Sequence, residues 1–179
     1  IEIITEDLTP IIYEGFDPLG LSPDTTSELK RFREAELTHG RVAMLAVVGI
    51  IAGEFVEGSS FLFDKGITGP AIGHFQQVPS PFWYALGGVI FLGEAKRIST
   101  GWASPFSNDL FSLKSDYVPG EIGFDPLGLL PTTPSEVIEM KNKELSHCRL
   151  AMIAAAWFVV KELTTGGKMF PGIDMYPLQ

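Results

Sequence analysis

The sequence carries one short polar motif twice, each time at the start of a long apolar stretch. The motif is E-x-x-H-x-R, and its two copies are Glu36-His39-Arg41 and Glu144-His147-Arg149. On a helix, a carboxylate and an imidazole three residues apart share one face. Both groups offer hard donor atoms to a divalent ion such as magnesium or iron. Each copy therefore predicts two ligand atoms on one helix face.

The arginine of each motif follows its glutamate by five residues, which is about 140° around a helix. The two charges of one copy are therefore badly placed to pair on their own helix. A charge that enters an apolar interior needs a partner. Reciprocal pairs, Glu36 with Arg149 and Glu144 with Arg41, would satisfy both copies. The alternative interpretation is that these are only interhelical salt bridges with a hydrogen-bonded histidine beside them.

The motif belongs to a longer internal repeat. Residues 15–58 align without a gap with residues 123–166, and nearly half of the aligned positions are identical. The segment FDPLGL, which begins at Phe16 and again at Phe124, has the same offset of 108 residues as the polar motif. Cys148 stands at the position equivalent to Gly40, which predicts a packing role for its side chain. Duplication in constant register predicts two helices related by a pseudo-twofold axis.

Three long helices and no strand are predicted, at about 25–57, 81–99 and 134–165. Thr25 and Glu28 have capping-box spacing, and Pro134 suits the first position of the third helix. The stretches between the helices, rich in glycine, proline and serine, are predicted to be loops. No apolar run reaches 18 residues, but the middle helix would be roughly 28 Å long, close to the thickness of a bilayer core. The fold class expected is an all-α membrane protein that forms a single domain over 1–179.

Composition excludes several classes of protein. The net charge of -9 disfavours binding to nucleic acid, whose phosphates would repel the chain. A single cysteine cannot form an internal disulfide or a cysteine-rich zinc site. We find no catalytic triad and no phosphate-binding glycine loop, so any chemistry is expected to belong to bound cofactors rather than to an enzyme site.

Two functions remain open from these residues alone. Glu-x-x-His on two helices occurs in di-iron carboxylate oxidoreductases, but there two further helices each add a glutamate, and only Glu94 is available here. The second function is a pigment scaffold, because the magnesium of a chlorophyll needs one axial ligand from a neutral histidine or a neutralised glutamate. The small residues that follow each motif, such as Ala43 and Ala151, would allow close helix approach.

The doubled FDPLGL, ELTHGRVAML with ELSHCRLAM, and the middle GEAKR make the sequence resemble the light-harvesting chlorophyll-binding family. The resemblance covers nearly the whole chain. Its loops are more similar to red-lineage antennae of the chlorophyll a/c and fucoxanthin type, associated with photosystem I, than to green-plant proteins. It implies three transmembrane helices, with the first and third crossed and locked by the reciprocal glutamate–arginine pairs.

The resemblance also implies a ligand set. The residues expected to bind chlorophyll magnesium are Glu36, His39, Glu94, Glu144 and His147, with Arg97 as the partner of Glu94. His74 and Gln77 are further candidates in the loop before the middle helix, and Gln76 is a weaker one. Lys161 stands where the family often has a ligand glutamine, and a protonated lysine has no lone pair, so that site is doubtful.

The implied cofactors are chlorophyll a and red-lineage carotenoids, with chlorophyll c and bound lipid as further candidates. The implied location is the plastid thylakoid membrane, with the photosystem I core, neighbouring antenna subunits and thylakoid lipids as partners. The function expected is light harvesting with transfer of excitation to a photosystem. Photoprotective quenching is the main alternative, and the di-iron oxidoreductase is a distant one.

Overall fold

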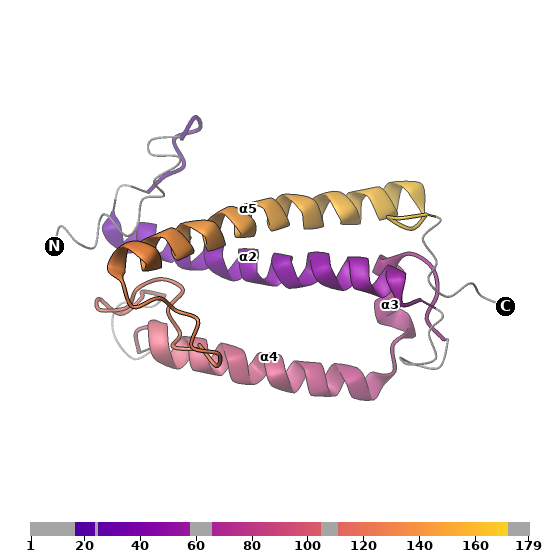
Figure 1. The fold of residues 1–179 in the computed structure, drawn as a ribbon, viewed down its shortest axis with the longest axis horizontal. Helices are drawn as coiled ribbons and strands as arrows, with labels where there is room; N and C mark the ends of the chain where they lie inside the picture. Colours follow the sequence, from indigo (N-terminus) through magenta and orange to yellow (C-terminus); the bar gives the residue numbers. More distant parts are fainter. Residues whose placement is uncertain (1–16, 24, 58–65, 105–110, 172–179) are drawn as a thin grey trace. The chain divides into compact units, whose positions relative to one another are not determined.

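The structure is a computed structural model, and it describes residues 17–23, 25–57, 66–104 and 111–171 (Figure 1). Gly15, Phe16, Asp24 and Gly58 of the first repeat copy lie outside these ranges. The helices of the described ranges are α2 (Thr26–Phe55), α3 (Ala71–Gln77), α4 (Ser80–Gly101) and α5 (Pro134–Thr165). The same ranges contain no strand, only an isolated bridge between Trp102 and Leu113. The expectation of an all-helical chain is therefore confirmed for the described residues.

Local sequence signals account for the ends of the two repeated helices. The Thr25 hydroxyl bonds to the Glu28 carboxylate at 2.9 Å and accepts the Glu28 N–H at 3.4 Å, which is the predicted capping box. Helix α5 begins at Pro134, whose missing N–H costs nothing at that position. It ends at Thr165, and the following Gly166 has a φ of 63° and donates its N–H to the Glu162 carbonyl at 2.9 Å.

The sequence predicted a loop at residues 73–77, and this prediction is wrong because they lie in helix α3. Two prolines explain why so short a helix forms here. Pro70 precedes it in an extended conformation, with φ -60° and ψ 143°, and Pro79 follows the C-cap Val78. His74 and Gln77 therefore lie on a helix that is bounded on both sides.

The middle helix α4 runs two residues further than expected, to Gly101. A β-carbon at this glycine would lie 2.7 Å from Cζ of Tyr117, so only glycine allows the tyrosine ring to pack there. The end of α4 is thus set by a contact with the following loop rather than by a local stop signal.

The chain divides into two units, which we describe separately. Unit 1 comprises residues 1–40 and 93–148, and unit 2 comprises residues 41–92 and 149–179. Helices α2, α4 and α5 each contribute one part to unit 1 and one part to unit 2.

In unit 1, α2 and α5 come into backbone contact at one point. A β-carbon on Gly40 would lie 2.2 Å from Cβ and 2.9 Å from Cα of Cys148. Gly40 and Cys148 are equivalent positions of the repeat, and a residue contacts its own equivalent only where the symmetry axis passes. Leu37 and Leu145, one turn earlier in each helix and also equivalent, are 8% and 3% exposed. Within unit 1 the contact is what a pseudo-twofold relation requires.

The two FDPLGL segments form the same turn. Asp17 accepts hydrogen bonds from the N–H groups of Leu21 and Ser22, and Asp125 accepts them from Leu129 and Leu130. The glycines of the two turns have φ values of 62° and 63°, which side chains rarely tolerate. The pKa of Asp17 is lowered by the N–H groups of Ser22 and Leu21, and that of Asp125 by those of Leu130 and Leu129.

The helices leave large apolar side chains exposed in the chain alone. Side chains exposed above 60% occur on all three long helices: Val42, Leu45 and Val48 on α2, Val89, Phe91 and Leu92 on α4, and Leu150, Ile153 and Trp157 on α5. Among the described residues, Thr26–Phe55 is the one helix long and apolar enough to cross a membrane by length and composition. The three predicted spans thus remain a prediction, while the exposed faces call for an apolar covering.

We predict that Gly40→Ala destabilises the protein, because the added methyl would meet the Cys148 backbone and Cβ, which cannot rotate away. The expected loss is at least about 1–3 kcal/mol, the usual cost of overpacking. Thermal melting followed by circular dichroism would measure it. Gly87→Ala is the matched control, since nothing lies within 4 Å of its position. Equal melting temperatures for the two variants would contradict the contact.

We also predict that each FDPLGL turn opens in acid. A carboxylate whose pKa is lowered on folding contributes stability above its ordinary value of 3.8, and this is lost as the pH falls through the lowered pKa. The protection of the Leu21 and Leu129 amides against hydrogen exchange, relative to the intrinsic rate at each pH, should therefore fall below about pH 3.8. Asp17→Asn should remove this pH dependence from the first turn alone, and Asp125→Asn from the second. Loss in both turns from either single variant would show a global effect instead.

Candidate functional site

The two motif histidines have the same hydrogen bond. Nδ1 of His39 lies 2.7 Å from the carbonyl oxygen of Ala35, and Nδ1 of His147 lies 2.7 Å from that of Lys143. A carbonyl can only accept, so Nδ1 carries the proton in each ring. Nε2 of a neutral ring then keeps its lone pair. Both side chains are exposed, so each offers one nitrogen donor outside the packed helices.

The motif glutamates lie beside these histidines. Glu36 is half-buried, and its Oε2 lies 3.7 Å from Nε of Arg33, one turn earlier on α2. Glu144 is likewise half-buried on α5. The reciprocal pairs Glu36–Arg149 and Glu144–Arg41 stay predictions.

On α4, Glu94 and Arg97 form the pair that the middle motif predicts. Nη2 and Nε of Arg97 lie 2.7 and 3.0 Å from the same oxygen, Oε2 of Glu94. Arg97 therefore neutralises the carboxylate without using Oε1, which can serve as a ligand atom. The Glu94 side chain is 45% exposed, so an approaching ion need not displace protein atoms.

Arg97 also contacts a second carboxylate, on α2, that the sequence did not predict. Glu34 on α2 is 3% exposed, and its Oε1 lies 3.3 Å from Nη1 of Arg97. Its Oε2 accepts hydrogen bonds from the Tyr117 hydroxyl at 3.0 Å and the Gly120 N–H at 2.8 Å. Thr38, also on α2, lies 3.3 Å from Nη1 of Arg97. One sequence signal was available, because the position equivalent to Glu34 in the second copy is the uncharged Asn142.

In unit 2, His74 and Gln77 have structural roles. Nε2 of His74 lies 2.8 Å from the Gly69 carbonyl, and its Nδ1 faces Gly53, 3.2 Å from where a β-carbon would stand. Gln77 bonds to both the N–H and the carbonyl of Thr68 at 2.8 Å. These contacts explain how helix α3 is held, and the ligand roles of His74 and Gln77 stay predictions.

Unit 2 also contains buried carboxylates that the sequence analysis did not single out. Glu54 is 4% exposed and accepts the N–H groups of Met169 and Phe170, while Glu162 is 3% exposed and accepts that of Ile72. Glu54 and Glu162 are equivalent positions of the repeat, so the offset could have found them. Nζ of Lys161 lies 2.7 Å from the Met169 carbonyl, so this lysine secures the chain after α5.

Three more contacts hold the parts of unit 2 around α3. Glu57 accepts the Gly69 N–H at 2.7 Å and lies 2.6 Å from Nζ of Lys168, so it contacts both the loop before α3 and the chain after α5. Trp83 at the start of α4 packs edge-on against Phe75 of α3. A buried carboxylate thus fixes two loop segments of this unit, and an aromatic contact joins α3 to α4.

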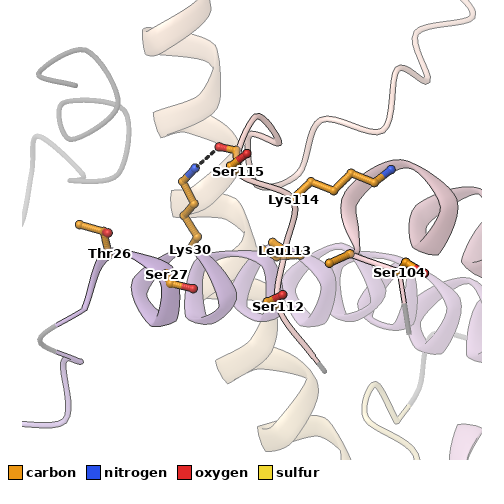
Figure 2. A pocket seen from close by; sticks show the side chains of 9 residues that line it. Thr26, Ser27, Lys30, Ser104, Ser112, Leu113, Lys114 and Ser115 are labelled. Atoms are coloured by element: carbon orange, nitrogen blue, oxygen red, sulfur yellow. Dashed lines mark hydrogen bonds between the residues drawn. The ribbon is translucent and has the colours of Figure 1, made fainter. Parts of the chain in front are cut away.

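A pocket of about 740 Å³ lies at the beginning of α2 in unit 1. Figure 2 shows Lys30 reaching the carbonyl of Ser115, a distance of 3.0 Å, while Lys114 extends away from it. Nζ of Lys114 lies 2.7 and 3.0 Å from the carbonyls of Ser99 and Thr100. Lys30 therefore holds the loop over the start of α2, whereas Lys114 holds the same loop to the end of α4.

The described residues favour isolated ligands over a metal cluster. Within residues 17–23, 25–57, 66–104 and 111–171, no three histidine, cysteine or acidic side chains gather closely enough to hold one metal ion. A di-iron carboxylate site needs such a group. Separate axial ligands on apolar helices are instead the arrangement that suits macrocycles which carry their own metal.

These features define a class, helical proteins with large exposed apolar faces and polar side chains of the types that bind single metal ions, and comparison with known families identifies which one. The family model described as "Chlorophyll A-B binding protein" matches residues 6–163. The chain belongs to this family of chlorophyll-binding antenna proteins. The expected chlorophyll and carotenoid cofactors agree with that membership.

Individual relatives support the same assignment. Over 158 residues the chain is 48% identical to light-harvesting complex stress-related protein 1 of Chlamydomonas reinhardtii, an alignment that covers 87% of this chain and 62% of that protein. It is 47% identical over 158 residues to a fucoxanthin-chlorophyll a-c binding protein of Isochrysis galbana, covering 84% and 73% of the two chains. A third relative is chlorophyll a-b binding protein CP24 10A of Solanum lycopersicum, 38% identical over 169 residues, covering 80% and 63%.

The chain thus spans somewhat less than two thirds of the stress-related relative. The names of all three relatives place them in the chloroplast, and the expected plastid location agrees with this. The fucoxanthin protein agrees with the expected red-lineage resemblance.

We predict that His39→Leu removes a chlorophyll without unfolding the helices, because Nε2 of His39 is exposed and the ring takes part in no long-range contact described above. Pigment extraction against protein content and far-ultraviolet circular dichroism would measure the two effects. Arg31→Leu is the matched control, since Arg31 is also exposed on α2 and is not a predicted ligand. Pigment content unchanged in His39→Leu would show that this histidine is not a ligand.

Proposed function

We propose that the protein is a light-harvesting antenna that binds chlorophyll and carotenoid in the thylakoid membrane and passes excitation to a photosystem. The observation that carries this proposal is the matched geometry of His39 and His147. Each ring is fixed through Nδ1 by its own helix, so each Nε2 lone pair has a set direction. Fixed ligand directions set the distances and orientations between pigments on which excitation transfer depends.

The remaining ligands in this proposal are Glu36, Glu144 and Glu94, with Arg97 neutralising Glu94. The three long helices would each span the membrane, and α2 and α5 would cross and be locked by Glu36–Arg149 and Glu144–Arg41. Lipid and pigment would cover the apolar faces that the chain alone leaves exposed. Chlorophyll c and bound lipid are further proposed cofactors.

The recipient of excitation is proposed to be a photosystem, with photosystem I favoured by the sequence resemblance. Neighbouring antenna subunits would be the other partners. Binding to isolated photosystem I and photosystem II cores tests this detail separately from the antenna function.

A second candidate function is photoprotective quenching. Its support is the 48% identity to relatives named light-harvesting complex stress-related proteins. A quenching antenna would use the same ligands and scaffold, but would return absorbed energy as heat. The two functions differ in the chlorophyll excited-state lifetime, which can be measured.

We predict that the purified pigmented protein shows carotenoid bands in the excitation spectrum of its chlorophyll fluorescence, because bound carotenoid would transfer energy to chlorophyll. A fluorescence lifetime near that of other antennae in detergent would favour harvesting, and a strongly shortened one would favour quenching. Metal analysis completes the test. A colourless protein that holds iron would overturn the antenna proposal.

A further inference from the structure

We infer that Glu34 is a positioning residue for the middle-helix chlorophyll, acting through Arg97 on the ligand carboxylate of Glu94. The inference rests on the proposed function, because the position of Glu94 matters to function only if that carboxylate binds a pigment.

In unit 1, Arg97 joins helix α4 to helix α2. The guanidinium of Arg97 lies between two carboxylates, Glu94 on its own helix and Glu34 on α2. A planar guanidinium that donates from different nitrogens to two fixed acceptors has little freedom to rotate. The orientation of the guanidinium then determines which oxygen of the Glu94 carboxylate accepts its hydrogen bonds.

Glu34 is itself held. Its Oε2 accepts the Tyr117 hydroxyl and the Gly120 N–H, both from the segment between α4 and α5. At 3% exposure, the side chain has almost no space for another rotamer. Three segments of unit 1 therefore meet at one carboxylate, and the anchor of Arg97 is rigid.

The contacts of Arg97 also identify the oxygen of Glu94 that is available as a ligand atom. Both short bonds from Arg97 go to Oε2 of Glu94, at 2.7 and 3.0 Å, so Oε1 is the oxygen left for magnesium. If the guanidinium were free to swing, it could take either oxygen. Groups in a second shell that orient a metal ligand typically matter by about 10–100-fold in metal affinity.

The two copies of the repeat can be compared at this site. Thr38 and its equivalent Ser146 both donate to the backbone carbonyl four residues earlier, at 2.7 and 2.9 Å. The local helix structure around this site is therefore the same in both copies, whereas the position equivalent to Glu34 is Asn142 in the second copy. The charge appears only in the copy that meets α4, which is where Arg97 needs it.

The test compares pigment retention in three variants of the full pigmented protein. Glu94→Leu removes the proposed ligand and should abolish one chlorophyll absorption band. Glu34→Gln keeps the shape but removes the charge that faces Arg97. It should shift that same band and weaken retention of its chlorophyll by about tenfold during detergent washing. The other bands should not change.

Glu54→Gln is the matched control. Glu54 lies on the same helix, is 4% exposed and also accepts two backbone N–H groups, but the contacts described for it include no ligand side chain. If Glu34→Gln and Glu54→Gln change the same bands equally, Glu34 contributes only to stability and the inference is overturned. Tyr117→Phe removes one donor to Glu34 and should give a smaller shift of the Glu94 band.

The outcomes distinguish a failure of this inference from a failure of the proposed antenna function. If Glu94→Leu loses its band while Glu34→Gln leaves it in place and unweakened, the ligand assignment stands and the positioning role falls. If Glu94→Leu keeps every band, Glu94 is not a ligand and the positioning role falls with it, while the other ligands continue to support an antenna.

Discussion

The close approach of two helices at Gly40 and Cys148 is the constraint on which the ligand geometry of unit 1 depends. Only a residue without a side chain fits at Gly40, so this face of α2 must turn toward α5. At 100° per residue, His39 then lies about 100° from the contact line and Glu36 about 40° from it. The histidine is consequently exposed and the glutamate half-buried, as observed. Because Cys148 is the equivalent of Gly40, the same reasoning applies to His147 and Glu144. One contact near the axis therefore sets the direction of ligands in both copies.

Polar contacts hold these helices to their loops more than an apolar core does. In the described ranges the buried hydrophobic residues are Leu37, Ala43, Tyr117, Leu145, Cys148 and Ala151, whereas long stretches of apolar surface are exposed. A soluble protein built this way would lack sufficient hydrophobic stabilisation. Buried carboxylates such as Glu34, Glu54 and Glu162 instead accept several hydrogen bonds from distant segments, which defines where the loops lie. The apolar faces remain available to pigment and lipid, so the protein's own contacts and the proposed cofactor contacts do not compete.

The sequence predicted what depends on local pattern or on self-similarity. The helix starts at Thr25 and Pro134, the Glu94–Arg97 pair and the equivalence of Gly40 and Cys148 all follow from spacing or from the offset of 108. It did not predict α3, because seven residues between two prolines carry too little periodicity to distinguish a helix from a loop. It also missed the role of Glu34, since Tyr117 and Gly120 lie 83 and 86 residues away along the chain. The contacts of His74 with Gly53 and Gly69 were likewise not predicted, because they depend on a loop whose path the sequence does not specify.

The two units use buried carboxylates differently, and the difference follows from the unpaired middle helix. In unit 2, Glu54 and Glu162 occupy equivalent positions and both accept backbone N–H groups, Glu54 from the chain after α5 and Glu162 from Ile72 in the first turn of α3. In unit 1, Glu34 has no charged equivalent, and its partner Arg97 comes from a helix that occurs once in the chain. Equivalent positions of a duplicated sequence can keep the same residue only where the two copies have the same neighbours. Asn142, the equivalent of Glu34 in the second copy, is half-buried and uncharged. The buried carboxylate is therefore found in the copy that contacts Arg97, where the guanidinium offsets the cost of burying its charge.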